Sequence, residues 1–180
     1  PKFNIQNLKK NTEIYIGFEG LKCKIIKHLK GEKIECTVIE SGLVEDNKGV
    51  HINQNINLIP LTEKDHDAIK LAIKYNVKKF ALSFANDTKG IDLIKKLTGK
   101  NSFIISKIET KKGFMNRKNI IKKSNAVLID RGDLSRYVPI SKIPFAQKMI
   151  LSSGKKEKTP IYVATNLLES MVNSKFPTRA

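Results

Sequence analysis

Apolar and polar residues alternate along the first third of the chain, in short runs separated by glycines. The runs Glu13–Ile16, Leu21–Ile25 and Ile34–Val38 follow this two-residue period, and Gly17 and Gly20 lie between the first two. Because successive side chains of a strand point to opposite faces, such alternation is typical of half-buried antiparallel strands. The pattern predicts a small β-rich domain over residues 1–57.

The pattern changes at Pro60, and a second domain is expected over residues 58–180. The run Thr62–Asp65 has the form of a capping box. In this motif a hydroxyl caps the start of a helix, and an acid three positions later accepts a hydrogen bond from the backbone N–H of the capping residue. A helix is expected to follow, with Ile69, Ala72 and Ile73 on one face.

Strands alternate with helices through the rest of the chain. Apolar runs predict strands at 79–84, 102–109, 126–129 and 160–164, and amphipathic segments predict helices at about 87–98, 116–123 and 141–151. This order is typical of parallel strands joined by helices. The fold class is therefore α/β, either an open doubly wound sheet or part of a (β/α) barrel.

Charged and hydroxyl residues collect where three of these strands end, which is where parallel α/β folds place their active sites. The two-residue period puts Lys107 and Glu109 on one face, and Asp133 follows the next strand beside Gly132. Two carboxylates from successive strands suit a hard cation such as Mg²⁺ or Mn²⁺ rather than zinc. An ammonium group there would offset phosphoryl charge, and exposed amides at Gly132 and Asp133 would receive a substrate carboxylate. Thr165 adds a hydroxyl after the fourth strand.

The same residues have purely structural interpretations. Lys107 and Glu109 are placed to form a salt bridge on one strand, and Asp133 is placed to cap a helix. Spacing alone leaves the metal site and these structural roles open.

The composition is that of a globular protein with a strongly basic surface. Of 180 residues, 40% are hydrophobic and 28% charged, and 34 Lys+Arg against 17 Asp+Glu give a net charge of +17. This charge favours anionic partners, but the basic residues are scattered as short pairs without a nucleic-acid-binding motif, so a nucleic acid is not expected.

No apolar run reaches the roughly 18 residues of a membrane span, so we expect a cytoplasmic protein without a membrane partner. Cys23 and Cys36 lack metal-type spacing and are expected to be free thiols.

Short motifs along nearly the whole chain resemble motifs of the pyruvate kinase family, and they recur in family order. These motifs are Lys48–Val50 (family KGVNLPG), Leu61–Asp65 (LSEKD), Ser106–Thr110 (KIEN), Asp130–Leu134 (ARGDLG), Ala146–Lys148 (AQK), Ala164–Met171 (ATQMLESM) and Pro177–Ala180 (PTRAE).

The resemblance implies a partial (β/α)8 barrel of about four βα units, preceded by part of a β-rich lid domain. It also implies the glycolytic transfer of a phosphoryl group from phosphoenolpyruvate to ADP, which gives pyruvate and ATP. By analogy with the family, Glu109 and Asp133 would bind Mg²⁺ or Mn²⁺, and Lys107 would stabilise the phosphoryl group.

The resemblance assigns the remaining site residues to the substrates. Thr165, with the amides of Gly132 and Asp133, would hold the carboxylate of phosphoenolpyruvate or pyruvate, and Thr165 would lie near the proton transfer. Lys48 would reach the phosphates of ADP or ATP. Asp130 departs from the family pattern, because it stands where the family has a small alanine and adds a carboxylate beside the metal site.

A closed barrel needs eight strands and about 250 residues, and only part of that is predicted here. By comparison with the family, the missing strands would carry the K⁺ ligands and much of the nucleotide pocket. We therefore expect a fragment of a longer protein, or a remnant that forms homo-oligomers or associates with the missing part of the barrel.

Two other functions remain open at this point. One is a non-catalytic pyruvate-kinase-like binding or regulatory module, which the missing strands and Asp130 favour. The other is a metal-dependent lyase or aldolase on a related barrel, which would also use strand-end Glu and Asp to bind a pyruvate enolate.

Overall fold

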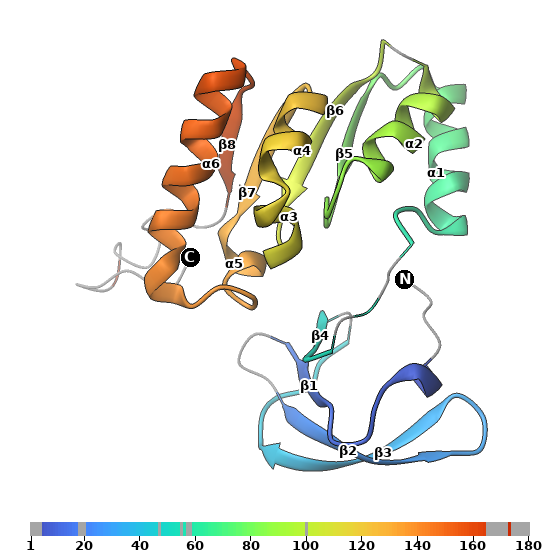
Figure 1. Ribbon diagram of the computed structural model, residues 1–180. Coiled ribbons are helices and arrows are strands. Elements are labelled where there is room, and N and C mark those ends of the chain that lie inside the picture. Colours follow the sequence, from blue (N-terminus) through green and yellow to red (C-terminus); the bar gives the residue numbers. More distant parts are fainter. Residues whose placement is uncertain are drawn as a thin grey trace. The chain divides into compact units, whose positions relative to one another are not determined.

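The chain forms two compact units, Pro1–Ile59 and Pro60–Ala180. The computed structural model describes residues 5–17, 21–46, 48–54, 56, 59–99, 101–164 and 173. Each unit has its own sheet and its own apolar core (Figure 1). Among the described residues, no helix combines the length and the apolar character needed to cross a membrane.

The first unit is built on a four-stranded antiparallel sheet with strand order β3-β2-β1-β4. Its core contains Leu8, Ile14 and Ile25, which are at most 7% exposed. Cys23 and Cys36 are free thiols, as predicted. The elements are η1 (Ile5–Asn7), β1 (Glu13–Ile16), β2 (Lys22–Leu29), β3 (Lys33–Glu40) and β4 (Val50–Ile52).

The three predicted strands of this unit are confirmed, although two of them are longer than predicted. Strands β2 and β3 form a hairpin that pairs from Lys22 with Glu40 to Leu29 with Lys33. Cross-strand hydrogen bonds therefore continue past the point where the apolar alternation fades. Strand β4 was not predicted, because three residues are too few to show a period; it forms by pairing with β1.

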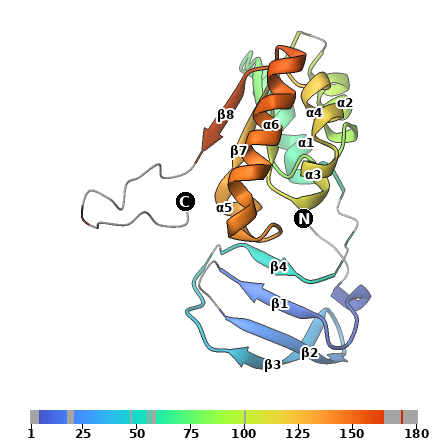
Figure 2. The same ribbon diagram turned by 60° about the vertical axis from the view of Figure 1, so that its left-hand side comes forward.

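The second unit is a four-stranded parallel sheet with strand order β5-β6-β7-β8. The helices gather on one face of this sheet (Figure 2). Its strands are β5 (Lys79–Leu82), β6 (Phe103–Ile108), β7 (Ala126–Asp130) and β8 (Ile161–Ala164). Its helices are α1 (Glu63–Lys74), α2 (Lys89–Thr98), α3 (Lys111–Met115), α4 (Arg117–Lys123), α5 (Arg131–Leu134), η2 (Ile140–Lys142) and α6 (Ile143–Glu157).

The core of the second unit lies between the sheet and the helices. Ile104, Ile108 and Ile129 of the strands are fully buried there. The helices contribute branched side chains, including Ile120 of α4 and Ile150 of α6, which are also fully buried. Burial of this apolar face, at about 25 cal/mol per Å² removed from water, is the main force that holds the helices on the sheet.

The strand and helix order of this unit is confirmed, and the element ends are where prediction was least accurate. The capping box is present, because the Asp65 amide donates to the Thr62 hydroxyl and the Thr62 amide donates to Asp65. The helix predicted at 116–123 is α4, and it is preceded by the short helix α3, which was not predicted. In α1, Ile69 is buried but Ile73 is 47% exposed, because α1 lies at the edge of the sheet (Figure 1).

Candidate functional site

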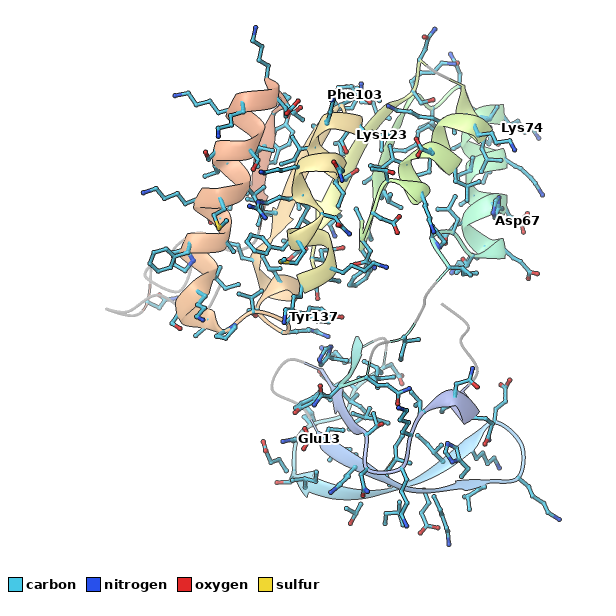
Figure 3. The ribbon with its side chains drawn as sticks, viewed as in Figure 1. Glu13, Asp67, Lys74, Phe103, Lys123 and Tyr137 are labelled. Carbon is cyan, nitrogen blue, oxygen red and sulfur yellow. The ribbon has the colours of Figure 1, made fainter. Side chains whose placement is uncertain are left out.

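The predicted acidic residues meet at the carboxyl ends of β6 and β7. These two strands are neighbours, with Ile108 paired to Ile129, so Glu109 and Asp130 follow at the same edge of the sheet. Figure 3 shows this edge through Tyr137, which follows α5 and lies at the end of the sheet opposite Phe103, the first residue of β6. The parallel register thus brings Glu109 close to Asp130 and Asp133, which are three residues apart in the chain.

Three carboxylates form one group, which we call the carboxylate cluster: Glu109, Asp130 and Asp133. One oxygen from each lies within 4.8 Å of the other two. The side chain of Glu109 is 1% exposed, that of Asp130 17% and that of Asp133 27%. Two members were predicted as ligands, and Asp130 was noted from the sequence as an added acid.

Lys107 places an ammonium group beside this cluster. Its Nζ is 2.5 Å from Glu109 Oε1 and 3.5 Å from Asp130 Oδ2. Burial lowers the pKa of Lys107, but the two carboxylates outweigh burial and hold this pKa above its ordinary value. The salt bridge that the sequence allowed between Lys107 and Glu109 is therefore present, and it lies within the group of residues predicted to carry the chemistry.

Glu109 is held in place by the loop after β5. The backbone N–H of Phe84 donates to Glu109 Oε2 at 2.5 Å. Burial raises the pKa of Glu109 above its ordinary value, although Lys107 and the Phe84 N–H oppose that effect. A buried carboxylate whose charged form is disfavoured in this way gains from a second cation nearby.

The segment after Glu109 packs tightly against the same loop. The Thr110 hydroxyl donates to Asn86 Oδ1 and accepts from the Gly113 amide, and Asn116 Nδ2 donates to the Asn86 carbonyl at 2.8 Å. These bonds tie the start of α3 to the residues that follow β5. No sequence pattern pointed to this support, because its partners are about 25 to 30 residues apart.

We expect Gly113→Ala to destabilise the protein by about 1–3 kcal/mol, because a methyl group there would overpack the contact between α3 and the β5 loop. A Cβ at this position would lie 2.5 Å from the backbone oxygen of Ala85, which cannot rotate away. Urea unfolding measures the change. The exposed Lys111→Ala on the same helix is the control, with an expected change within about 0.5 kcal/mol; equal unfolding midpoints for the two variants would contradict the prediction.

Asp130, not Asp133, caps the short helix α5. Asp130 Oδ1 accepts from the Asp133 amide at 3.3 Å, and Asp133 is the third residue of that helix. The alternative that Asp133 is the N-cap is therefore wrong. Asp133 instead lies with its Oδ1 3.5 Å from Arg136 Nε, a contact that the sequence did not suggest.

The remaining predicted residues are distributed differently. Gly132 lies in α5, between Asp130 and Asp133. Lys48 belongs to the first unit, where its Nζ is 2.8 Å from Glu45 Oε2. Thr165 lies outside the described residues.

The carboxylate cluster has the donor chemistry and the size of a site for a hard divalent cation. Its donors are carboxylate oxygens, which Mg²⁺ and Mn²⁺ prefer. Two oxygens bound on opposite sides of Mg²⁺, each at about 2.1 Å, are roughly 4.2 Å apart. Oxygens within 4.8 Å of one another therefore need only small side-chain adjustments to share one ion.

Known proteins match this chain over nearly its whole length. The family model described as "Pyruvate kinase, barrel domain" matches residues 3–180. The pyruvate kinase of Methanocaldococcus jannaschii is 34% identical over 183 aligned positions, which cover 99% of this chain and 40% of that protein. The pyruvate kinase of Thermotoga maritima is 33% identical over 97% of this chain and 38% of its own length, and that of Clostridium perfringens is 35% identical over 90% and 35%.

The chain thus spans 35% to 40% of the length of these relatives. Its parallel α/β sheet, its strand-end acids and the match over residues 3–180 lead to one conclusion. The chain belongs to the pyruvate kinase family.

Proposed function

We propose that this chain carries the central part of a pyruvate kinase active site. The reaction would transfer the phosphoryl group of phosphoenolpyruvate to ADP, giving ATP and an enolpyruvate that is protonated on carbon to pyruvate. The observation that supports this most directly is the carboxylate cluster with Lys107 in contact with it. Such a group suits phosphoryl transfer, in which catalysis is mostly positioning and charge stabilisation.

Glu109 and Asp133 would hold Mg²⁺ or Mn²⁺, and Asp130 is close enough to be a third ligand. When bound, the ion would neutralise charge on the phosphoryl and enolate oxygens. Glu109 supports this role because it is almost fully buried. Water therefore does not solvate its carboxylate, and a bound cation would stabilise the negative charge.

Lys107 would donate hydrogen bonds to the transferring phosphoryl group. Its ammonium is already directed to this place by Glu109 and Asp130, so little ordering is required when substrate binds. Its raised pKa keeps it protonated at neutral pH, which is the form that stabilises phosphoryl charge.

The substrate carboxylate would bind at the start of α5, to the amides of Gly132 and Asp133 and to the hydroxyl of Thr165. The Asp133 amide now donates to Asp130 at a long distance of 3.3 Å, so a substrate carboxylate would compete with Asp130 for that donor. Thr165 would also lie near the enolpyruvate carbon that gains a proton. Lys48 would leave its contact with Glu45 to reach the phosphates of the nucleotide.

The larger architecture follows from the same proposal. The four βα units of the second unit would be part of a (β/α)8 barrel, and the antiparallel unit would be part of the family's lid. The K⁺ ligands would lie on strands outside this sequence. Partners would include the remaining strands of the barrel and further copies of the chain.

A non-catalytic binding module is the second candidate, and one contact favours it. Asp130, where the family has alanine, lies 3.5 Å from Lys107 Nζ and so draws the ammonium toward a second carboxylate. A lysine shared by two acids is less available to a phosphoryl group.

Metal-dependent binding of phosphoenolpyruvate tests the proposal. Calorimetry on the chain should show much tighter binding of phosphoenolpyruvate with Mn²⁺ than with EDTA, because without a cation the carboxylate cluster repels a trianionic ligand. Pyruvate should then form when ADP, Mg²⁺ and K⁺ are added. Binding without turnover would favour the module, and cleavage of a 2-oxo acid would favour a lyase; binding unaffected by EDTA would contradict the proposed site.

A further inference from the structure

A groove of about 570 Å³ lies between α4 and α6 in the second unit. These two helices pack side by side on the same face of the sheet (Figures 1 and 2). None of the groove's lining residues belongs to the carboxylate cluster or contacts it through any of the described ion pairs. A ligand in this groove would therefore be bound independently of the proposed active site.

The groove carries a strong excess of positive charge. Its lining includes four basic side chains, Arg117, Lys118, Lys148 and Lys156, and one acidic side chain, Glu157. Within the described part of the chain, none of these four forms an ion pair with a carboxylate. Four unneutralised cations around one hollow repel one another, and an anion in the hollow would relieve that repulsion.

Arg117 is fixed at one end of this groove. Its guanidinium carbon lies 4.7 Å from the centre of the Phe114 ring, and its Nη1 donates to the Phe114 carbonyl at 3.1 Å. Its Nε is covered and finds no acceptor among the described residues. The side chain is thus held in one orientation while its charge stays unpaired, which reduces the ordering needed to bind a ligand.

Two of the other four lining groups are serine hydroxyls, and the remaining two are Met149 and Glu157. Ser152 is an exposed hydroxyl on α6, and Ser153 already donates to the Met149 carbonyl at 2.9 Å. The four basic side chains offer only donors, which matches a ligand that only accepts, such as a phosphate group. The volume is in the range of small-molecule sites, roughly 300–1,000 Å³. Among the described residues, none that lines the groove is aromatic, so these residues offer no stacking surface for the bases of a single-stranded nucleic acid.

We propose that the groove between α4 and α6 is a second anion site, which binds a small phosphorylated molecule. Arg117 is the fixed contact to a phosphate oxygen, and Lys148 and Lys156 of α6 supply further charge from the facing helix.

Binding of inorganic pyrophosphate, measured by calorimetry at about 0.15 M ionic strength with EDTA, tests this site. The EDTA removes any divalent cation, so the carboxylate cluster does not attract the anion. The double variant Lys148→Ala/Lys156→Ala should bind pyrophosphate at least about tenfold more weakly, because it loses two charge-assisted contacts. Arg117→Lys keeps the positive charge but loses the planar guanidinium, which can donate two parallel hydrogen bonds to a phosphate. This variant should bind pyrophosphate several-fold more weakly.

The matched control is Lys64→Ala/Lys74→Ala, which removes the same charge from exposed positions on α1. Its affinity should stay within about twofold of the wild type, since long-range charge effects at exposed sites are small. An equal loss in both double variants would show attraction by net charge alone and would overturn the proposal, as would the absence of binding. Lys107→Met should leave pyrophosphate binding unchanged, which separates this site from the proposed active site.

Discussion

Glu109→Gln is expected to weaken Mn²⁺ binding by more than about 100-fold, and Asp133→Asn should have an effect of the same order. Each change replaces a charged oxygen ligand with a neutral amide of the same shape. In Glu109→Gln the side-chain carbonyl can still accept from the Phe84 N–H, so the backbone support of this position is retained. The loss therefore reports on metal coordination rather than on packing, and calorimetry or the electron paramagnetic resonance of free Mn²⁺ measures it.

Asp130→Asn separates the two roles of the third acid in the cluster. Asparagine is as good an N-cap as aspartate, so the start of α5 should be preserved. A drop in affinity as large as that of Asp133→Asn would make Asp130 a ligand, and a small change would leave it as the cap of α5. The exposed Asp67→Asn on α1 is the control for net charge. Unchanged Mn²⁺ affinity in both Glu109→Gln and Asp133→Asn would rule out the metal site.

Lys107→Met is expected to lower the free energy of unfolding by about 2–3 kcal/mol at neutral pH, because it leaves the buried Glu109 carboxylate without its cation. This loss is at the low end of the range for removing one partner of a buried ion pair, because the Lys107 side chain is 24% exposed and water screens its charge. Methionine fills a similar volume, so lost packing contributes little. Urea unfolding of the two proteins measures the difference.

The loss caused by Lys107→Met should shrink as the pH falls. Burial already raises the pKa of Glu109, and removing Lys107 takes away the group that opposes this most strongly. A carboxyl with a raised pKa in the folded state binds its proton more tightly there than in the unfolded chain. The destabilisation caused by Lys107→Met is therefore fully present when the pH is above the raised pKa of Glu109 in the folded variant. It disappears as the pH falls below that pKa and Glu109 becomes protonated.

A double-mutant cycle with Glu109→Gln provides the control. Once Glu109 carries no charge, the further change Lys107→Met should cost much less than it does in the wild type. Additive losses, or a Lys107→Met loss that is constant from neutral to acidic pH, would show that the two side chains are not coupled.

Much of the fold could be predicted from local pattern. The capping box at Thr62, the strand and helix order of the second unit and the three strands before it were all confirmed. Each of these depends on neighbours within about four residues, and periodicity reports on such neighbours directly. The short helix α3 was not predicted, because its place depends on distant contacts such as the hydrogen bond from Asn116 to Asn86.

The candidate site likewise combines residues that could be predicted from the sequence with contacts that could not. Lys107, Glu109 and Asp133 could be chosen from the sequence because strand ends are where parallel sheets place their chemistry. The Phe84 amide that binds Glu109 and the capping of α5 by Asp130 could not, since both depend on how loops from separate strands meet.

By itself, the sequence determined the class of fold, the family and the identity of the acids and the lysine. These follow from side-chain chemistry and spacing along the chain. Only the tertiary structure decided that the three carboxylates share one small volume, that Lys107 contacts two of them, and that α4 and α6 enclose a basic groove. Such arrangements arise when parallel strands pair in register and helices pack on their common face, which brings together residues that no local pattern connects.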